Sequence, residues 1–403
     1  MWPKAKLKFV ARFGYGDALP TNEVQEGPFQ VFGSNGPFAS FSRANTGAPA
    51  IVVGRKGSYG KVNWTPEPCY ASDTTFFVDE SISRNQLRWV FWLLQTLRLD
   101  EGTDEAAVPG LNRESAYSRD VLVPPLPQQR AIADYLDRET ARLDALVGAK
   151  ERVLGLLAEK RRALISQAVT RGLDRRAPLR DSGIPWIGKI PAYWRRMRLR
   201  FLICHLEQGW SPEAENREPG EDEWGVLKLN AVSHGRFDQS AAKALPPDFA
   251  ICADLEVHQS DFLVTRSNTP LLVGDVCFVQ ETRPRLMLCD LIYRLTLRED
   301  VIDGTFLGYF LTLPEARCQI ETDARGTSNS MVKISQEHIK DWQIPVPHLD
   351  EQRAIVRSLN RETTKLDAMC AAIERTIDLL KERRVALIAA AVTGRINVVE
   401  ADT

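Results

Sequence analysis

The sequence lacks the features that mark membrane, secreted and metal-binding proteins. No apolar run approaches the ~18 residues of a membrane span, and no apolar core follows the polar N-terminus. The seven cysteines are an odd number and form no Cys-x-x-Cys pair, which excludes a complete disulfide framework. The five histidines show no metal-ligand spacing with these cysteines. We therefore expect a soluble cytoplasmic protein without a metal site.

Motifs for cofactor and phosphate binding are missing as well. Residues 54–61 resemble a phosphate-binding loop, but five residues separate Gly54 from Gly60, and Val62 follows Lys61. A phosphate-binding loop requires four residues between its glycines and Ser or Thr after the lysine. No glycine-rich strand-to-helix turn indicates a bound dinucleotide or S-adenosylmethionine. The sequence therefore predicts no catalytic residue and no cofactor.

What is present is an ordinary globular composition in a long chain. Of the 403 residues, 44% are hydrophobic and 26% are charged, as is typical of soluble proteins. This length exceeds what one hydrophobic core usually supports, so we expect two or more domains. The formal net charge of -1 favours neither a nucleic acid nor a protein as the partner.

A long internal repeat organises the chain. Residues 129–170 match residues 352–393 at 24 of 42 positions without a gap. Both copies begin with Gln-Arg-Ala-Ile and end with Ala-Val-Thr. A repeat of this length indicates duplicated structure, and duplicated structure favours a two-fold arrangement of partners.

Both copies have the spacing of a coiled-coil helix. Seam residues recur with a 3.5-residue period, and prolines precede both copies but are absent within them. At about 1.5 Å per residue, such a helix would reach ~60 Å. Because both copies belong to one chain, they are expected to pair with each other. The residues expected at the helix-pair or partner interface are Ile132, Leu136, Leu143, Leu154, Leu157, Arg161, Leu164, Ile355, Leu359, Leu366, Ile377, Leu380, Arg384 and Leu387.

One seam position is charged in both copies. Arg161 and Arg384 are equivalent residues of the repeat. They could set the register of the helices, contact a partner, or simply extend into solvent along their apolar stems. The sequence leaves these alternatives open.

Weaker similarity precedes each helix, starting at Trp2 and at Trp194. The offset between the copies grows from 192 to 223 residues along these regions. Short runs rich in Val, Ile, Phe and Leu predict strands, and the spacing over 85–98 and 305–313 predicts helices. We therefore expect two α+β globules, with residues 171–193 as the connector. The extra residues of the second globule are expected in loops, where recognition tends to lie.

Polar residues gather in loops at aligned places of the two globules. Arg and Lys can read guanine, Asn can read adenine, and Ser, Thr and backbone N–H groups can bind phosphate. Hydrophilic surface loops without a ligand would show the same composition. The candidate DNA-binding residues are Ser34, Asn35, Arg55, Lys56, Ser58, Tyr59, Lys61, Lys228, Asn230, Arg266, Ser267, Asn268, Thr269, Arg325, Thr327, Ser328 and Asn329.

Together these features resemble the specificity subunits of type I restriction–modification systems. The resemblance rests on the proline-rich lead into each Gln-Arg-Ala-Ile segment, on the helix end at 163–172 and its second copy, and on residues 181–194 and 326–335. It covers essentially the whole chain. In one respect the chain departs from it, because Trp2 is not preceded by a counterpart of residues 174–193. Either this copy is trimmed or the true start lies upstream.

The resemblance implies an α+β protein with two pseudo-symmetric α/β target-recognition domains. They would be separated by two long helices that form an antiparallel coiled coil. The implied domains are target-recognition domain 1 at 1–127, helical spacer 1 at 128–172, target-recognition domain 2 at 173–347 with a lead-in linker at 173–193, helical spacer 2 at 348–397, and a tail at 398–403.

The function that this resemblance implies is recognition without catalysis. Each domain would read one half of a bipartite site in double-stranded DNA. The subunit would recruit two methyltransferase subunits and, in the full assembly, two restriction subunits that translocate and cut DNA in defence against phage. The alternative is a coiled-coil scaffold that binds two copies of a protein partner and no DNA. The target bases cannot be deduced, because no code maps loop sequence to target.

Overall fold

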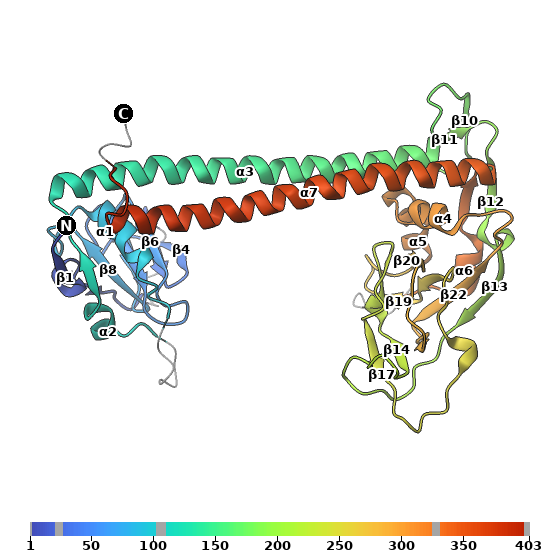
Figure 1. Ribbon diagram of the computed structural model, residues 1–403, viewed down its shortest axis with the longest axis horizontal. Helices are drawn as coiled ribbons and strands as arrows, with labels where there is room; N and C mark the ends of the chain where they lie inside the picture. Colours follow the sequence, from blue (N-terminus) through green and yellow to red (C-terminus); the bar gives the residue numbers. More distant parts are fainter. Residues whose placement is uncertain (1, 21–26, 102–109, 325–330, 399–403) are drawn as a thin grey trace. The chain divides into compact units, whose positions relative to one another are not determined.

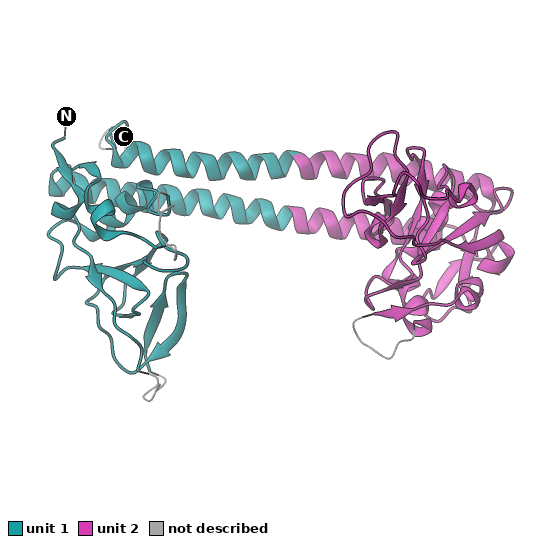
Figure 2. Ribbon diagram, turned by 90° about the horizontal axis from the view of Figure 1, so that it is seen from below, with its two compact units in different colours: residues 1–153, 372–403 teal, residues 154–371 magenta. Residues whose placement is uncertain are grey.

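The computed structural model describes residues 2–20, 27–101, 110–324 and 331–398 of the chain. The chain forms two compact units (Figure 2). Unit 1 consists of residues 1–153 and 372–403, and unit 2 of residues 154–371. Two long helices, α3 (Leu126–Arg171) and α7 (Leu349–Val392), each contribute one end to each unit (Figure 1).

Unit 1 is built on two small sheets. A four-stranded sheet has the order β2-β8-β5-β6, and a three-stranded sheet has the order β4-β3-β7. A further strand pair, β1 with β9, lies next to the start of α3 in the sequence. The elements are β1 (Lys4–Lys6), η1 (Leu7–Phe9), β2 (Gly14–Tyr15), β3 (Phe29–Gly33), β4 (Gly36–Phe41), β5 (Ala50–Gly54), β6 (Val62–Thr65), β7 (Tyr70–Ala71), β8 (Thr75–Asp79), α1 (Leu87–Thr96), α2 (Arg113–Tyr117) and β9 (Asp120–Leu122).

Unit 2 repeats this plan with additions. Its four-stranded sheet, β13-β22-β18-β20, and its three-stranded sheet, β17-β14-β21, keep the strand order of unit 1. In each three-stranded sheet one pair is parallel, β3 with β7 and β14 with β21. The elements are β10 (Leu179–Asp181), β11 (Lys189–Pro191), β12 (Arg195–Arg198), η2 (Leu199–Phe201), β13 (Ile203–Gln208), β14 (Gly225–Leu227), η3 (Leu229–Ala231), β15 (Val232–Ser233), β16 (Arg236–Phe237), β17 (Ala242–Ala244), η4 (Ala253–Leu255), β18 (Phe262–Thr265), β19 (Ser267–Asn268), β20 (Val276–Phe278), β21 (Leu286–Met287), β22 (Ile292–Leu297), α4 (Gly304–Leu311), α5 (Pro314–Asp323), β23 (Val332–Lys333), α6 (Gln336–Asp341) and β24 (Gln343–Val346).

The α+β fold class predicted from the sequence is confirmed, and so are the two long helices. Helices predicted over 85–98 and 305–313 are found as α1 and α4. The connector predicted at 171–193 is more ordered than expected, because β10 and β11 form an antiparallel hairpin within it. A glycine-rich and proline-rich composition marks turns, but it did not show that the intervening residues pair.

Each hydrophobic core includes the ends of both long helices. In unit 1 the core that contains Trp89 also contains Ile132 of α3 and Val392 of α7. In unit 2 the core that contains Phe306 also contains Val169 of α3 and Ile355 of α7. The start of one helix thus packs with the end of the other in both units. This is the antiparallel arrangement that the family resemblance implied.

A buried glutamine attaches the start of each long helix to the globule. Gln129 accepts a hydrogen bond from the backbone N–H of Gln86, the N-cap residue of α1 (2.9 Å). Gln352 accepts one from the backbone N–H of Asp303, the N-cap residue of α4 (2.8 Å). Each side-chain amide also donates 2.9 Å bonds to a proline carbonyl five residues earlier and to a second oxygen of the globule. The glutamine of the repeated Gln-Arg-Ala-Ile sequence therefore attaches each long helix to its globule. We call this attachment the joint.

A tryptophan closes the same joint in both units. Trp2 donates from Nε1 to Gln128 Oε1 at 2.8 Å, and Trp194 donates from Nε1 to Glu351 Oε2 at 3.2 Å. Gln128 and Glu351 are equivalent residues of the repeat. These equivalent contacts in the two halves show that the duplication extends beyond the helices to Trp2 and Trp194.

The predicted seam is the covered side of each helix. None of the fourteen seam residues is exposed. Those that are buried are Ile132, Leu136, Leu143, Leu157, Ile355, Leu359, Leu366 and Ile377, and those that are half-buried are Leu154, Arg161, Leu164, Leu380, Arg384 and Leu387.

The charged seam positions form equivalent ion pairs. Arg161 pairs with Asp367 within unit 2, and Arg384 pairs with Asp144 within unit 1. The repeat relates the two arginines to each other and the two aspartates to each other. Arg384 Nε lies 3.0 Å from Asp144 Oδ1 but without hydrogen-bond geometry, so this contact is an ion pair only. Because the side chains are 30–58% exposed, solvent screens both pairs, and we expect them to contribute little to stability.

We predict that Gln352→Ala destabilises unit 2. The substitution leaves the Asp303 N–H and two carbonyl oxygens without the side-chain amide, and unsatisfied buried groups cost ~1–3 kcal/mol each. We expect the free energy of unfolding, measured by urea denaturation, to fall by about 2 kcal/mol or more. Arg353→Ala, at the exposed next residue, is the control and should have little effect. Equal effects of the two substitutions would show that the hydrogen bonds of Gln352 do not stabilise the joint.

Candidate nucleic-acid interface

In unit 1 two predicted loops lie against each other. They are the turn between β3 and β4 and the loop between β5 and β6. Lys61 donates from Nζ to the Asn35 backbone oxygen at 2.7 Å and to Asn35 Oδ1 at 3.0 Å. A Cβ atom at Gly54 would lie 2.9 Å from the Ser34 oxygen and 2.5 Å from the Ser58 oxygen. Glycine is therefore required where the two loops meet.

Some side chains of this cluster are buried and stabilise the turn, and others are exposed to solvent. Ser34 is buried, and its Oγ donates to the Thr74 backbone oxygen at 2.6 Å, so it holds the turn instead of facing solvent. Asn35, Lys56 and Ser58 are exposed. Lys56 Nζ has no hydrogen-bond or ion-pair partner among the described residues.

A cavity of about 430 Å³ continues this surface. It is lined by Ser58, Tyr59 and Lys61 of the loop and by Arg98 just after α1. Arg98 was missed by the sequence analysis, which placed it at the end of a helix. Its backbone takes a left-handed conformation (φ 44°), and its guanidinium pairs with Glu101 at 3.2 Å. The cations Lys61 and Arg98 thus lie at this cavity together with the acidic Asp100 and apolar residues such as Leu94.

Arg55 and Arg266, predicted as DNA contacts, have matching structural bonds. Arg55 donates from Nη1 to the Asp73 backbone oxygen at 3.2 Å, and Arg266 does so to the Asp290 backbone oxygen at 3.5 Å. Their own backbone oxygens accept hydrogen bonds from the backbone N–H groups of Leu111 and Ile334, which are separated by the same 223 residues as the two copies of the repeat. Both arginines are half-buried, and Arg55 also lies over the Tyr15 ring at 5.1 Å. These residues therefore belong to the common framework of the two globules.

The segment after Arg266 is a strand and not the free loop that we expected. Ser267 and Asn268 form β19, which pairs with β23. Ser267 is fully buried and donates from Oγ to the Val332 backbone oxygen at 3.2 Å. Asn268 accepts from the backbone N–H of Thr269 at 2.8 Å, and Thr269 is exposed. A short polar run does not reveal such edge pairing, because its partner lies 65 residues away.

Lys228 and Asn230 lie in the connection between β14 and β17. This connection corresponds to the turn of Ser34 and Asn35 between β3 and β4. Asn230 lines an open cavity of about 1280 Å³, and neither Arg266 nor Asn268 lines it. Further polar lining residues, missed by the sequence analysis, are Ser233, His234, Arg236, Gln239, Gln280 and Tyr309. The growing offset between the copies predicted extra loop residues in the second globule, but it did not place them in this connection or show which of them line the cavity.

The last group of candidates cannot be placed. Arg325, Thr327, Ser328 and Asn329 lie outside the described residues.

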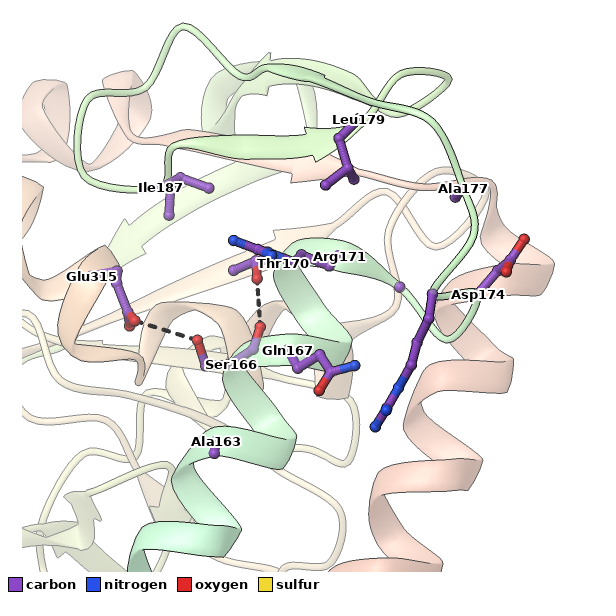
Figure 3. A pocket seen from close by; sticks show the side chains of 12 residues that line it. Ala163, Ser166, Gln167, Thr170, Arg171, Asp174, Ala177, Leu179, Ile187 and Glu315 are labelled. Carbon is purple, nitrogen blue, oxygen red and sulfur yellow. Dashed lines mark hydrogen bonds between the residues drawn. The ribbon is translucent and has the colours of Figure 1, made fainter.

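A separate cavity of about 610 Å³ lies at the C-terminal end of α3 (Figure 3). Ser166 donates from Oγ to Glu315 Oε1 at 3.3 Å, and Thr170 donates from Oγ1 to the Ser166 backbone oxygen at 2.6 Å. None of the predicted DNA-binding residues lines this cavity. It belongs to the junction of the helix with the β10–β11 hairpin.

The described residues form no metal cluster, and the cysteines Cys277 and Cys289 are buried. Among them no group of three or more His, Cys, Asp or Glu side chains could hold a metal ion. Burial raises the pKa of the Cys289 thiol to about 11 and also raises the pKa of the Cys277 thiol, so both remain protonated at neutral pH. In the same residues, no helix is long and apolar enough to cross a membrane.

Comparison with known proteins gives sequence and structural relatives, while no family model matches the chain. The type I restriction enzyme EcoEI specificity subunit of Escherichia coli is 31% identical over 183 residues, which are 45% of this chain and 30% of that protein. The type I restriction enzyme MjaVIII specificity subunit of Methanocaldococcus jannaschii is 22% identical over 283 residues, 68% of this chain and 64% of that protein. The chain thus spans less than two thirds of the length of either relative.

The fold has a solved counterpart. A chain from a structure concerned with complex assembly and conformational transition of the type I restriction–modification system matches with a TM-score of 0.69. The two chains share 15% sequence identity, and the match covers 98% of each. The resemblance inferred from the sequence is confirmed: this chain is similar in sequence to the specificity subunits of type I restriction enzymes, and it shares the fold of a chain from such a system.

Proposed function

We propose that this chain is the DNA-specificity subunit of a type I restriction–modification complex and has no catalysis of its own. The observation that carries the proposal is the similarity to type I specificity subunits, together with the duplicated fold. Target-recognition domains at 1–127 and 173–347 would each read one half of a bipartite site in double-stranded DNA. The helical regions 128–172 and 348–397 would set the unread gap between the halves.

The structures of the two globules support the proposal that each reads a different half-site. Their sheets keep the same strand order, and their joints to the helices keep the same hydrogen bonds. Their surface connections differ, as the β3–β4 turn and the β14–β17 connection show. A common frame with different loops is what two readers of different sequences require. A scaffold that binds two copies of one protein would instead favour similar surfaces on both globules.

The long helices offer equivalent docking positions for two copies of a partner. Leu146 and Leu156 of α3 are 43% and 63% exposed, and their repeat equivalents Met369 and Leu379 of α7 are 51% and 64% exposed. Large apolar side chains exposed at matched positions are typical of interaction sites. We propose that they bind two methyltransferase subunits, and that two restriction subunits join the full assembly in the cytoplasm.

The proposed function predicts a bipartite methylation pattern. In a host that expresses the chain with its methyltransferase subunit, we expect N6-methyladenine at one split motif with a fixed gap. Sequencing of modified bases measures the motif directly. Methylation at an undivided motif would refute recognition by two domains. Absence of salt-sensitive duplex binding by the purified complex would support the scaffold alternative.

Lys56→Ala should weaken binding to all duplex sequences equally. Lys56 is exposed and unpaired among the described residues, so it is placed to contact phosphate. The slope of log affinity against log salt, measured on the purified complex, should become less steep by about 1. Lys8→Ala, an exposed lysine of η1, is the control and should leave the slope unchanged. A changed sequence preference in the Lys56 variant would show base contact instead.

Leu156→Glu combined with Leu379→Glu should abolish co-purification of the methyltransferase subunit. A charge at each position disfavours burial in an apolar interface. The control is Ala158→Glu, which is exposed and lies about 200° around the helix from Leu156. Circular dichroism should report intact helices in all variants. If the double variant still binds two methyltransferase subunits, the docking positions lie elsewhere.

A further inference from the structure

The β14–β17 connection is where unit 2 departs most clearly from unit 1. In unit 1 the corresponding strands β3 and β4 are joined by two residues, Ser34 and Asn35. In unit 2 the strands are joined by the fourteen residues 228–241, which contain η3 and the β15–β16 hairpin. We call residues 228–241 the inserted hairpin segment. It occupies the same place in the same sheet, so it elaborates a feature that both globules share.

The inserted hairpin segment is held firmly. His234 and Gly235 form its tip, and both have left-handed backbone conformations (φ 50° and 77°), as a two-residue hairpin turn requires. The His234 backbone N–H donates to Oδ2 of the buried Asp275 at 2.6 Å. Val232 is buried in the core of the three-stranded sheet. The backbone of the tip is therefore preorganised.

Two exposed side chains of this segment are polar and make no hydrogen bond or ion pair among the described residues. Asn230 and Arg236 are exposed, line the 1280 Å³ cavity, and have no side-chain hydrogen bond or ion pair among the described residues. Gln239 accepts from the Arg283 backbone N–H at 2.8 Å, which leaves its amide N–H groups available. Asp238 is committed, because its carboxylate accepts from the Ser240 N–H and hydroxyl.

The rest of the cavity is compatible with a nucleic acid. Arg161 of α3, Gln280 and Glu281 also line it, so donors and acceptors face the inserted hairpin segment from other elements. Acidic groups are not excluded from such a site, because a carboxylate can accept from cytosine N4. The Asp238 carboxylate has its pKa lowered by the Ser240 hydrogen bonds and remains ionised at neutral pH.

The equivalent arginines Arg55 and Arg266 do not explain how the two globules would read different half-sites. Arg55 and Arg266 have the same place and the same backbone bonds in the two globules, so neither distinguishes one globule from the other. The inserted hairpin segment is present in one globule only. A two-stranded ribbon fits the major groove, where Arg reads guanine and Asn reads adenine.

We infer that the inserted hairpin segment determines the half-site read by unit 2, with Arg236 and Asn230 as the side chains that contact base edges. This inference rests on the proposed function, because it assumes that the complex binds duplex DNA. It extends the proposal by naming the element that specifies one half of the target.

The test compares methylated motifs. The chain is expressed with its methyltransferase subunit as wild type, Arg236→Ala, Asn230→Ala or the control Arg176→Ala, an exposed arginine of the connector. We expect Arg236→Ala and Asn230→Ala each to relax one position of one half-site, with tenfold or greater loss of base discrimination. The other half-site and the gap should not change. Arg176→Ala should leave the whole motif intact.

The other outcomes separate the inference from the function. An unchanged motif methylated less completely would mean that these residues contact phosphate, and it would overturn base reading by the hairpin. Relaxation of both half-sites would overturn its assignment to one globule. Absence of any bipartite methylation with the wild-type chain would refute the proposed function itself. Both variants remove exposed, unpaired side chains, and co-purification with the methyltransferase subunit verifies that each is folded.

Discussion

The structure depends on cores that each globule shares with both long helices. Neither α3 nor α7 could leave a unit without exposing apolar core residues, such as Ile132 and Val392 in unit 1. The buried amides of Gln129 and Gln352 add direction to this apolar contact, since each bonds to the N-cap of a helix in its globule. Burial supplies most of the free energy, and the hydrogen bonds fix how each helix enters its globule.

The repetition of these joints separates what is constant from what is variable. The contact of Trp2 with Gln128 in unit 1 recurs in unit 2 as the contact of Trp194 with Glu351. The inserted hairpin segment has no such counterpart, because two residues replace it in unit 1. Similarity therefore follows the parts that meet the helices, and difference follows the parts that face solvent. That distribution is what we expect if, as proposed, both globules attach to the helices in the same way and each reads a different half-site.

Much of the architecture was predictable, since periodic patterns determine helices and seams. The 3.5-residue spacing located α3 and α7, and the paired arginines Arg161 and Arg384 marked a special seam position, although their aspartate partners were not foreseen. The candidate site was harder. Ser34 and Ser267 were predicted to contact DNA but are buried, and their hydroxyl groups donate hydrogen bonds to backbone oxygens that are distant in the sequence. Arg236 was overlooked because composition does not show which side chains of an insertion converge on a cavity.

The place of the inserted hairpin segment has an evolutionary consequence. It bridges β14 and β17, whose pairing is already secured by a sheet that unit 1 also contains. Closing a loop of fourteen residues instead of two costs only about 2 kcal/mol in chain entropy, because the penalty grows with the logarithm of length. New residues can therefore be inserted, lost or exchanged at this point with little risk to folding. If this segment reads DNA as we propose, a gene that carries this fold could acquire a new target by changing one short stretch of codons, without altering the residues that attach the globules to the helices.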